Sequence, residues 1–213
     1  MIKIFIKPIN ELIIVNEEIT NVCFVDKTNY RDFVINLYDN IILSIDDTPV
    51  SIDSKALIIF DPLNIEINDK KTLTLLYKKL SHRVSEKVQE KIRKIEQDIL
   101  ELLEIVSVES MFPIEYEDSF ELIKIFQMYQ ISIQELKKEN YLEFIVTYIK
   151  TNFELNNYNI VVSFGLTRLL TADEINKLTK ELAINQISIV DFYYDDSKPK
   201  DNYLVIDSDW SKI

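Results

Sequence analysis

The amino-acid sequence predicts an α/β protein in which a helical segment interrupts a head of strands and helices. Short apolar runs on either side of the middle of the chain, such as KALIIF and NIVVSF, are typical of strands buried on both faces of a sheet. Between them, apolar residues recur every three or four positions over 73–106, which indicates helix. Strand and helix patterns alternate again after residue 160. The first and last parts are therefore expected to form one domain around a sheet.

The N-terminal part is predicted to be rich in strands. KIFI and LIIV flank Pro8-Ile9-Asn10, which favours a hairpin, and NVCFV is a third short strand. YRDFVINLYDN spaces its apolar residues as a short helix does. KALIIFDPLNI is a nearly continuous apolar run that ends at Asp61-Pro62, the pattern of a buried strand.

The middle of the chain is predicted to be helical. From Asp69 to about Val106 there is neither Pro nor Gly, so the sequence predicts one helix. About 36 helical residues would extend about 54 Å, which exceeds the diameter of a globule of this size. Two further helices are expected near 118–130 and 140–154, folded back along the first. We expect a discontinuous head domain at residues 1–64 and 156–213, with a helical leg domain at 65–155.

The C-terminal part returns to strands around one helix. NIVVSF is predicted to be a buried strand, and Thr171 and Glu174 form a capping box that opens a helix to about Ala183. ISIVDFYY and YLVID are two more predicted strands.

Composition excludes several kinds of functional site. Gly165 is the one glycine, whereas a Walker A loop and a nucleophile elbow each need two and a dinucleotide fingerprint needs three. One His and one Cys cannot form a Cys/His zinc site within the chain. Cys23 lies in the apolar stretch VCFV and is expected to be an inert core thiol. His82 has no evident carboxylate partner and is interpreted as a partly exposed helix residue.

The sequence also predicts where the protein acts. The N-terminus has no signal-peptide core, and no apolar run reaches the roughly 18 residues that a membrane span needs. We therefore expect a cytoplasmic protein that does not contact a membrane.

Positive charge is concentrated in one segment of an acidic chain. Residues 70–94 contain nine Lys or Arg and two acids, Glu86 and Glu90, although the whole chain has a net charge of −12. On one helix, Lys79, Arg83, Lys87 and Lys91 would form a ridge able to follow a phosphate backbone. The alternative is a solvated face that pairs with nearby acids. The expected DNA contacts are Lys78, Lys79, Arg83, Lys87, Lys91 and Lys94.

A cluster of acids follows the long helical segment, in the sequence IEYEDSFELIK. Its candidate metal ligands are Glu115, Glu117, Asp118 and Glu121. Carboxylate oxygens at this density suit Ca²⁺ or Mg²⁺. The alternative is that these acids simply lie at the positive end of a helix, with Asp118 or Ser119 as N-cap.

A metal-dependent nuclease is a further hypothesis. Such enzymes gather carboxylates, often beside a lysine. Asp61, Glu117 and Asp118 with Lys124 offer these groups, although their spacing does not require such a site.

The order of these segments resembles one protein family. FDPLNIEIN after a strand, a long helix, IEYEDSFELIK, a helical return, then IVVSFGLTRLLTADEINKLTKEL and ISIVDFYY are together similar to the Csn-two family. This family is the small accessory protein of type II-A CRISPR spacer acquisition. The similarity covers nearly the whole chain and is best from about residue 56 to 192.

The resemblance implies a degenerate P-loop-ATPase-like head with a helical leg, assembled as a homotetrameric ring. It implies binding of the ends of linear double-stranded DNA without cleavage, binding of calcium, and no nucleotide. The implied partners are the CRISPR integrase pair and the type II effector nuclease, and the implied calcium ligands lie among Glu115, Glu117, Asp118 and Glu121. Here this stretch is shorter than is usual in the family, and Pro113 replaces an acid, which favours weak or no calcium binding.

The sequence thus supports three hypotheses of function. The leading hypothesis is a non-catalytic ring that binds double-stranded DNA without sequence preference. The alternatives are the metal-dependent nuclease and a purely structural module whose acidic surface meets a basic protein.

Overall fold

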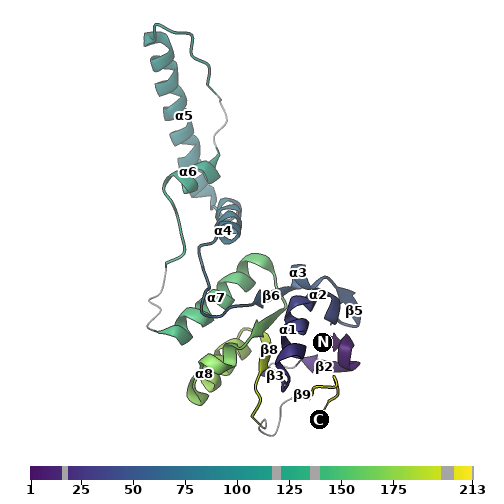
Figure 1. Ribbon diagram of the computed structural model, residues 1–213. Coiled ribbons are helices and arrows are strands. Elements are labelled where there is room, and N and C mark those ends of the chain that lie inside the picture. Colours follow the sequence, from purple (N-terminus) through teal and green to yellow (C-terminus); the bar gives the residue numbers. More distant parts are fainter. Residues whose placement is uncertain (16–18, 117–120, 135–139, 198–203, 213) are drawn as a thin grey trace. The chain divides into compact units, whose positions relative to one another are not determined.

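The computed structural model describes residues 1–15, 19–116, 121–134, 140–197 and 204–212 (Figure 1). Two compact units make up the chain, unit 1 with Met1–Ile67 and Glu135–Ile213, and unit 2 with Asn68–Gln134. In the described part, no helix combines the length and the apolar character that crossing a membrane requires.

Unit 1 is a mixed α/β structure with a parallel sheet, which confirms the predicted α/β class. Its elements are, in chain order, β1 (Ile2–Ile6), η1 (Lys7–Ile9), β2 (Glu11–Val15), β3 (Ile19–Phe24), α1 (Lys27–Ile35), α2 (Leu37–Asn40), β4 (Ile41–Ile45), β5 (Thr48–Val50), α3 (Ile52–Lys55), β6 (Ala56–Ile59), α7 (Tyr141–Asn156), β7 (Ile160–Phe164), η2 (Leu166–Leu169), α8 (Ala172–Ala183), β8 (Ser188–Tyr194) and β9 (Leu204–Ile206).

The larger sheet has five strands in the order β6-β7-β8-β3-β9, and every neighbouring pair is parallel. Each strand corresponds to one of the apolar runs predicted as strands. β6 and β7 are neighbours, although the whole of unit 2 separates them in sequence. Because all five strands run the same way, their carboxyl ends meet at one edge of the sheet.

A smaller antiparallel sheet has the order β2-β1-β4-β5. Its β1–β2 hairpin confirms the prediction for KIFI and LIIV. Strands β4 and β5 were not predicted from the sequence, and they are joined by Asp46 and Asp47 with φ of 49° and 63°. Aspartate tolerates this left-handed conformation better than most residues, so it can form a tight hairpin turn without glycine. Pro49 fits because β5 is an edge strand.

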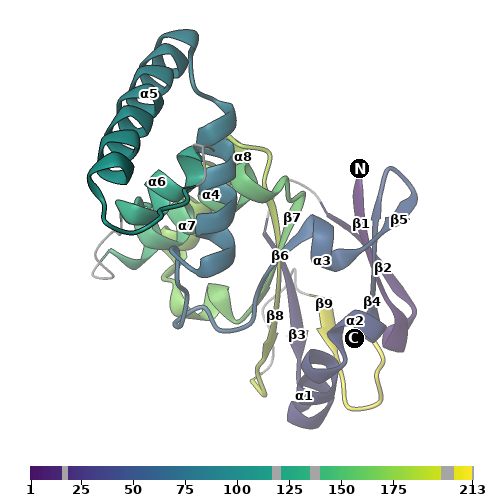
Figure 2. The same cartoon turned by 90° about the horizontal axis from the view of Figure 1, so that it is seen from above.

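The parallel sheet is covered on both faces (Figure 2). On one face α1 and the small sheet pack against side chains such as Val162 and Phe164, and on the other α7 and α8 pack against Val161 and Ile189. The capping box at the start of α8 is present as predicted, between Thr171 and Glu174.

Helix α7 belongs to unit 1, although it was expected in the leg domain. Its side chains Phe144, Ile145 and Ile149 are buried in the core that it shares with the sheet. Unit 2 therefore ends at Gln134, whereas the expected leg extended to residue 155. Apolar spacing identified the helix but not its partner, because a helix buries the same kind of face against a sheet as against another helix.

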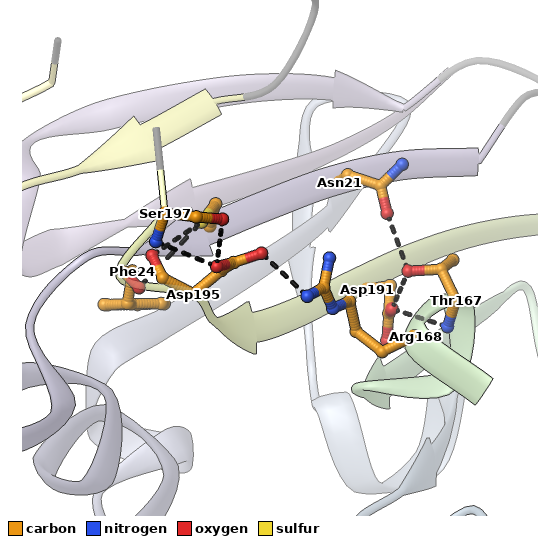
Figure 3. Close-up of polar contacts among 8 residues, drawn as sticks. Asn21, Phe24, Thr167, Arg168, Asp191, Asp195 and Ser197 are labelled. Atoms are coloured by element: carbon orange, nitrogen blue, oxygen red, sulfur yellow. Dashed lines mark hydrogen bonds and ion pairs between the residues drawn. The ribbon is translucent and has the colours of Figure 1, made fainter. Parts of the chain in front are cut away.

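One buried carboxylate interrupts the apolar core, at Asp191 in the middle of β8. It accepts hydrogen bonds from the Ser163 hydroxyl of β7 at 2.6 Å and from the backbone N–H groups of Leu166 and Thr167 at 3.0 and 2.9 Å. The Thr167 hydroxyl also contacts Asp191, and it lies 3.1 Å from the side-chain oxygen of Asn21 on β3 (Figure 3). Asp191 thus links β7, the start of η2 and, through Thr167, β3.

We predict that Asp191→Asn destabilises the protein by at least about 2 kcal/mol, because one acceptor oxygen is replaced by an amide group among donors that stay buried. Urea unfolding would measure the free energy of unfolding. Asp196→Asn makes the same chemical change at an exposed position just after β8 and should change that value by less than about 0.5 kcal/mol. Equal effects of the two substitutions would contradict a structural role for Asp191.

Candidate nucleic-acid interface

Unit 2 contains three helices in its described residues: α4 (Lys70–His82), α5 (Glu86–Glu109) and α6 (Leu122–Met128). The prediction of one continuous helix over 69–106 is therefore wrong. The 24 residues of α5 extend about 36 Å. The first helix begins as expected, since the Asp69 carboxylate accepts a hydrogen bond from the backbone N–H of Thr72 at 2.7 Å.

The break between α4 and α5 lies at residues 83–85. Arg83 caps α4 with φ −98° and ψ 12°, and Ser85 is extended with φ −67° and ψ 159° at the N-cap of α5. Serine is a preferred N-cap residue, and Glu86 in the first turn is favoured by the helix dipole. This start signal is present in the sequence, but the uninterrupted apolar spacing across it led to the prediction of one helix.

α4 is held within unit 2 by α6 and by the segment after it. The rings of Tyr77 and Phe126 lie 6.2 Å apart between centroids. The Asn68 side chain donates to the Ile133 carbonyl at 2.9 Å and accepts from the Ile133 N–H at 2.8 Å. Both ends of unit 2 are thus joined by hydrogen bonds.

The residues expected to contact DNA lie on α4, on α5 and at the break between them. We call them the basic strip: Lys78, Lys79, Arg83, Lys87, Lys91 and Lys94. All are exposed except Lys79, which is half-buried. The predicted ridge is divided, because Lys79 belongs to α4, Arg83 to the break, and Lys87 and Lys91 to α5. Within the described part of the chain, no ion pair involves Lys78, Lys87, Lys91 or Lys94, so these four ammonium groups are available to an anionic partner.

Charge is distributed along α5 against its own dipole. Up to Lys94 the helix has four Lys or Arg and two acids, and after Lys94 it has five acids and no base. A helix is stabilised by acids near its N-terminus and bases near its C-terminus, so this order costs stability. The stability of the helix alone therefore does not account for this order of charges.

The apolar side of α5 is also largely exposed in the part of the chain that is described. None of its residues is buried, and Ile95, Ile99 and Leu102 are 48%, 39% and 58% exposed. The apolar residues along this side of α5 are alternately four and three positions apart, which is the heptad pattern of a coiled-coil seam. The residues in this pattern are Val88, Ile92, Ile95, Ile99, Leu102 and Val106. Such a face on an isolated helix indicates a packing partner.

The acidic segment forms no metal site in the part of the chain that is described. Glu115 and Glu121 are exposed, and Glu121 forms a 3.4 Å ion pair with Lys124. Glu117 and Asp118 lie outside the described residues. Among residues 1–15, 19–116, 121–134, 140–197 and 204–212, no three His, Cys, Asp or Glu side chains are grouped to hold a metal ion. Calcium binding by the acids of this segment stays a prediction.

The residues considered for catalysis do not form one site within either unit. Asp61 belongs to unit 1 and Lys124 to unit 2. His82 is exposed at the end of α4, as expected. Cys23 is buried, and burial raises the pKa of its thiol, so it has the properties predicted for an inert core residue.

Comparison with known proteins identifies the family. Residues 36–210 match the family model described as CRISPR-associated protein (Cas_Csn2). The chain belongs to the Cas_Csn2 family. The match extends through both units, and it confirms the resemblance found in the sequence. The Cas_Csn2 assignment gives the protein a CRISPR-associated role.

Other comparisons add less to the Cas_Csn2 assignment. No curated protein matches the chain. Among solved structures, it is similar to a putative ABC transporter ATP-binding protein from Pyrococcus furiosus, with 10% identity, a TM-score of 0.43, and coverage of 97% of this chain and 96% of that one. It is also similar to cbiO1 of the ABC transporter complex cbiONQ from Clostridium perfringens, with 11% identity, a TM-score of 0.46, and coverage of 100% and 86%. Both TM-scores are below 0.5 and establish no shared fold.

We predict that backbone amides exchange hydrogen faster at the break between α4 and α5 than within either helix. The backbone N–H groups of Val84 to Lys87 have no backbone acceptor among the described residues, whereas Val88 and Gln89 both donate to the Ser85 carbonyl at 2.9 Å. The amides of Val84 to Lys87 should therefore exchange faster than the other amides of α4 and α5. Protection that continues unbroken from Leu80 to Lys91 would instead support a single helix.

Proposed function

We propose that this CRISPR-associated protein binds double-stranded DNA through the basic strip, without sequence preference and without cutting it, during spacer acquisition. The observation that carries the proposal is the set of four exposed lysines with no ion pair in the described part of unit 2. Lysine contacts to phosphate release counterions and give binding that is independent of sequence.

The charge of the rest of the molecule supports this location. Outside residues 70–94 the chain has 15 Lys or Arg and 34 Asp or Glu. An acidic surface repels the phosphate backbone, so DNA is restricted to the segment that attracts it. The same acids are available to the basic surfaces of protein partners, for which the family resemblance proposes the CRISPR integrase pair and the type II effector nuclease.

The proposal includes self-association into a homotetrameric ring. The exposed heptad pattern of α5 supports it, because a second copy would bury the same side chains of both helices. A closed ring would hold linear DNA by threading, so closed circles should bind less well than linear duplexes.

We further propose that unit 1 is a P-loop-like head that has lost its nucleotide. In nucleotide-binding α/β folds, the turn after a central strand holds phosphate at the N-terminus of a helix. Here α1 follows β3, and the Asp26 carboxylate accepts a hydrogen bond from the backbone N–H of Asn29 at 2.8 Å. A fixed negative charge therefore lies at the helix end that would otherwise attract phosphate.

Calcium binding forms a separate part of the proposal. It rests on the family resemblance, with Glu115, Glu117, Asp118 and Glu121 as the ligands. A metal-dependent nuclease is the competing function, and the release of fragments from end-labelled linear DNA in the presence of Mg²⁺ or Mn²⁺ would establish it.

We predict that reversing charge in the strip weakens DNA binding. The double variant Lys87→Glu with Lys91→Glu should raise the dissociation constant for a linear duplex more than tenfold. The plot of log association constant against log salt concentration should also become less steep, by about two units of slope. Fluorescence anisotropy at several salt concentrations would measure both quantities.

The matched control for this variant is Lys177→Glu with Lys180→Glu, the same charge change on the exposed face of α8 in unit 1. If both variants weaken binding equally, only the net charge of the molecule matters, and the assignment to the basic strip is wrong. If neither variant weakens DNA binding, the result favours the hypothesis of a structural module whose acidic surface binds a basic protein.

We predict that Leu102→Asp lowers the solution mass, because a charge in the heptad pattern would have to be buried in the assembly. Light scattering would measure the mass. Gln97→Asp adds the same charge on another side of α5 and should leave the mass unchanged. A wild-type protein that is already monomeric would exclude the ring.

A further inference from the structure

Unit 1 contains a groove that the proposed function does not use. It lies beside α1, has a volume of about 430 Å³ and falls within the range of ligand pockets, roughly 300–1,000 Å³. The chain after β6 and the end of β7 form its other side. The residues that line it are Lys27, Thr28, Tyr30, Arg31, Val34, Ile35, Phe60 and Phe164.

An aromatic stack reaches the surface at this groove. Phe60 and Phe164 are nearly parallel, with an angle of 6° between the rings and 5.2 Å between their centroids. Phe164 in turn stacks on Phe192, with an angle of 26° and centroids 5.8 Å apart. Phe164 and Phe192 are buried, whereas Phe60 is 48% exposed. The stack is rigid at its buried end, and its last ring is accessible to a ligand.

Positive charge lies on the α1 side of the same groove. Lys27 and Arg31 are one helical turn apart, and both are exposed. Arg31 forms a 3.3 Å ion pair with Asp32, and Lys27 has no ion pair in the part of the chain that is described. The groove therefore combines an aromatic surface with a cation that forms no ion pair among the described residues.

Hydroxyl groups complete the lining. Thr28 and Tyr30 both reach the groove. Burial, followed by the charge of Asp191, raises the pKa of Tyr30 to about 12, so its hydroxyl stays protonated near neutral pH.

We propose that this groove binds an unpaired nucleotide at the end of a DNA strand. The base stacks on Phe60, and its phosphate contacts Lys27 and Arg31, which is how proteins hold single-stranded nucleic acid without reading its sequence. An unpaired end suits the groove because its base is exposed without any cost of breaking a pair.

The groove favours a strand end over a free nucleoside triphosphate. The chain has no glycine-rich loop for a polyphosphate, and the Asp26 carboxylate already occupies the nearby helix N-terminus. A nucleotide that is part of a longer strand needs only the stack and one phosphate contact here. This inference rests on the proposed DNA binding, to which it adds a preference between kinds of DNA end.

The test compares a blunt duplex with the same duplex carrying a short single-stranded overhang, by anisotropy at constant salt. The full-length protein is expected to bind the overhang duplex about tenfold more tightly. Phe60→Ala should abolish this difference and leave the affinity for the blunt duplex unchanged. Leu63→Ala, at an exposed apolar residue outside the groove, should preserve it.

Two further comparisons examine the chemistry of the groove. Phe60→Leu retains an apolar side chain without a ring face, so a preserved preference in this variant would overturn base stacking. An overhang of abasic sugar-phosphate should bind like the blunt end, and Lys27→Gln should reduce the preference for the normal overhang.

The outcomes also separate this inference from the proposed function. Equal binding of blunt and overhang duplexes by the wild-type protein would overturn the groove assignment alone, whereas no binding of either would overturn both. Saturable micromolar binding of adenosine monophosphate that Phe60→Ala removes would assign the groove to free nucleotides instead. Binding of an acidic peptide in place of the overhang would assign it to a protein partner.

Discussion

The carboxylate of Asp191 is the interaction on which the arrangement of unit 1 depends. It is buried in a layer of apolar side chains, so the groups that donate to it have no water as a substitute. Its bonds to Ser163 and Thr167 hold β7 and β8 at one register and fix the turn through Gly165, whose φ of 79° is left-handed. The carboxyl edge of the sheet, where Phe164 and Phe60 stack, is built on this junction.

The two units differ in how they are stabilised. Unit 1 buries both faces of its parallel sheet, and the largest fully buried side chains of the described residues all belong to it. In unit 2 the longest helix, α5, has no buried residue and orders its charges against its dipole. A helix of this kind buries little apolar surface within the described part of its own chain, which is why the proposed partners are assigned to its faces.

The proposed interactions divide between the units in the same way. Phosphate contacts of duplex DNA are assigned to the basic strip of unit 2, where ammonium groups are exposed. The stacking of an unpaired base is assigned to unit 1, where a rigid core presents one ring of an aromatic stack. Long-range attraction and shape-specific contact require different surfaces, because charges act through solvent whereas stacking requires a fixed ring.

The sequence by itself determined the α/β class, the strands of the parallel sheet, the hairpin around Pro8, the capping box at Thr171 and the concentration of charge at residues 70–94. These follow from local periodicity and composition. Tertiary structure decided the packing of α7 on the sheet, the environment of Asp191 and the meeting of Phe60 with α1. Each of these joins residues far apart in the chain, and spacing along a sequence contains no information about which distant faces meet. The break at Ser85 is different, since its signal is local but weaker than the apolar repeat that crosses it.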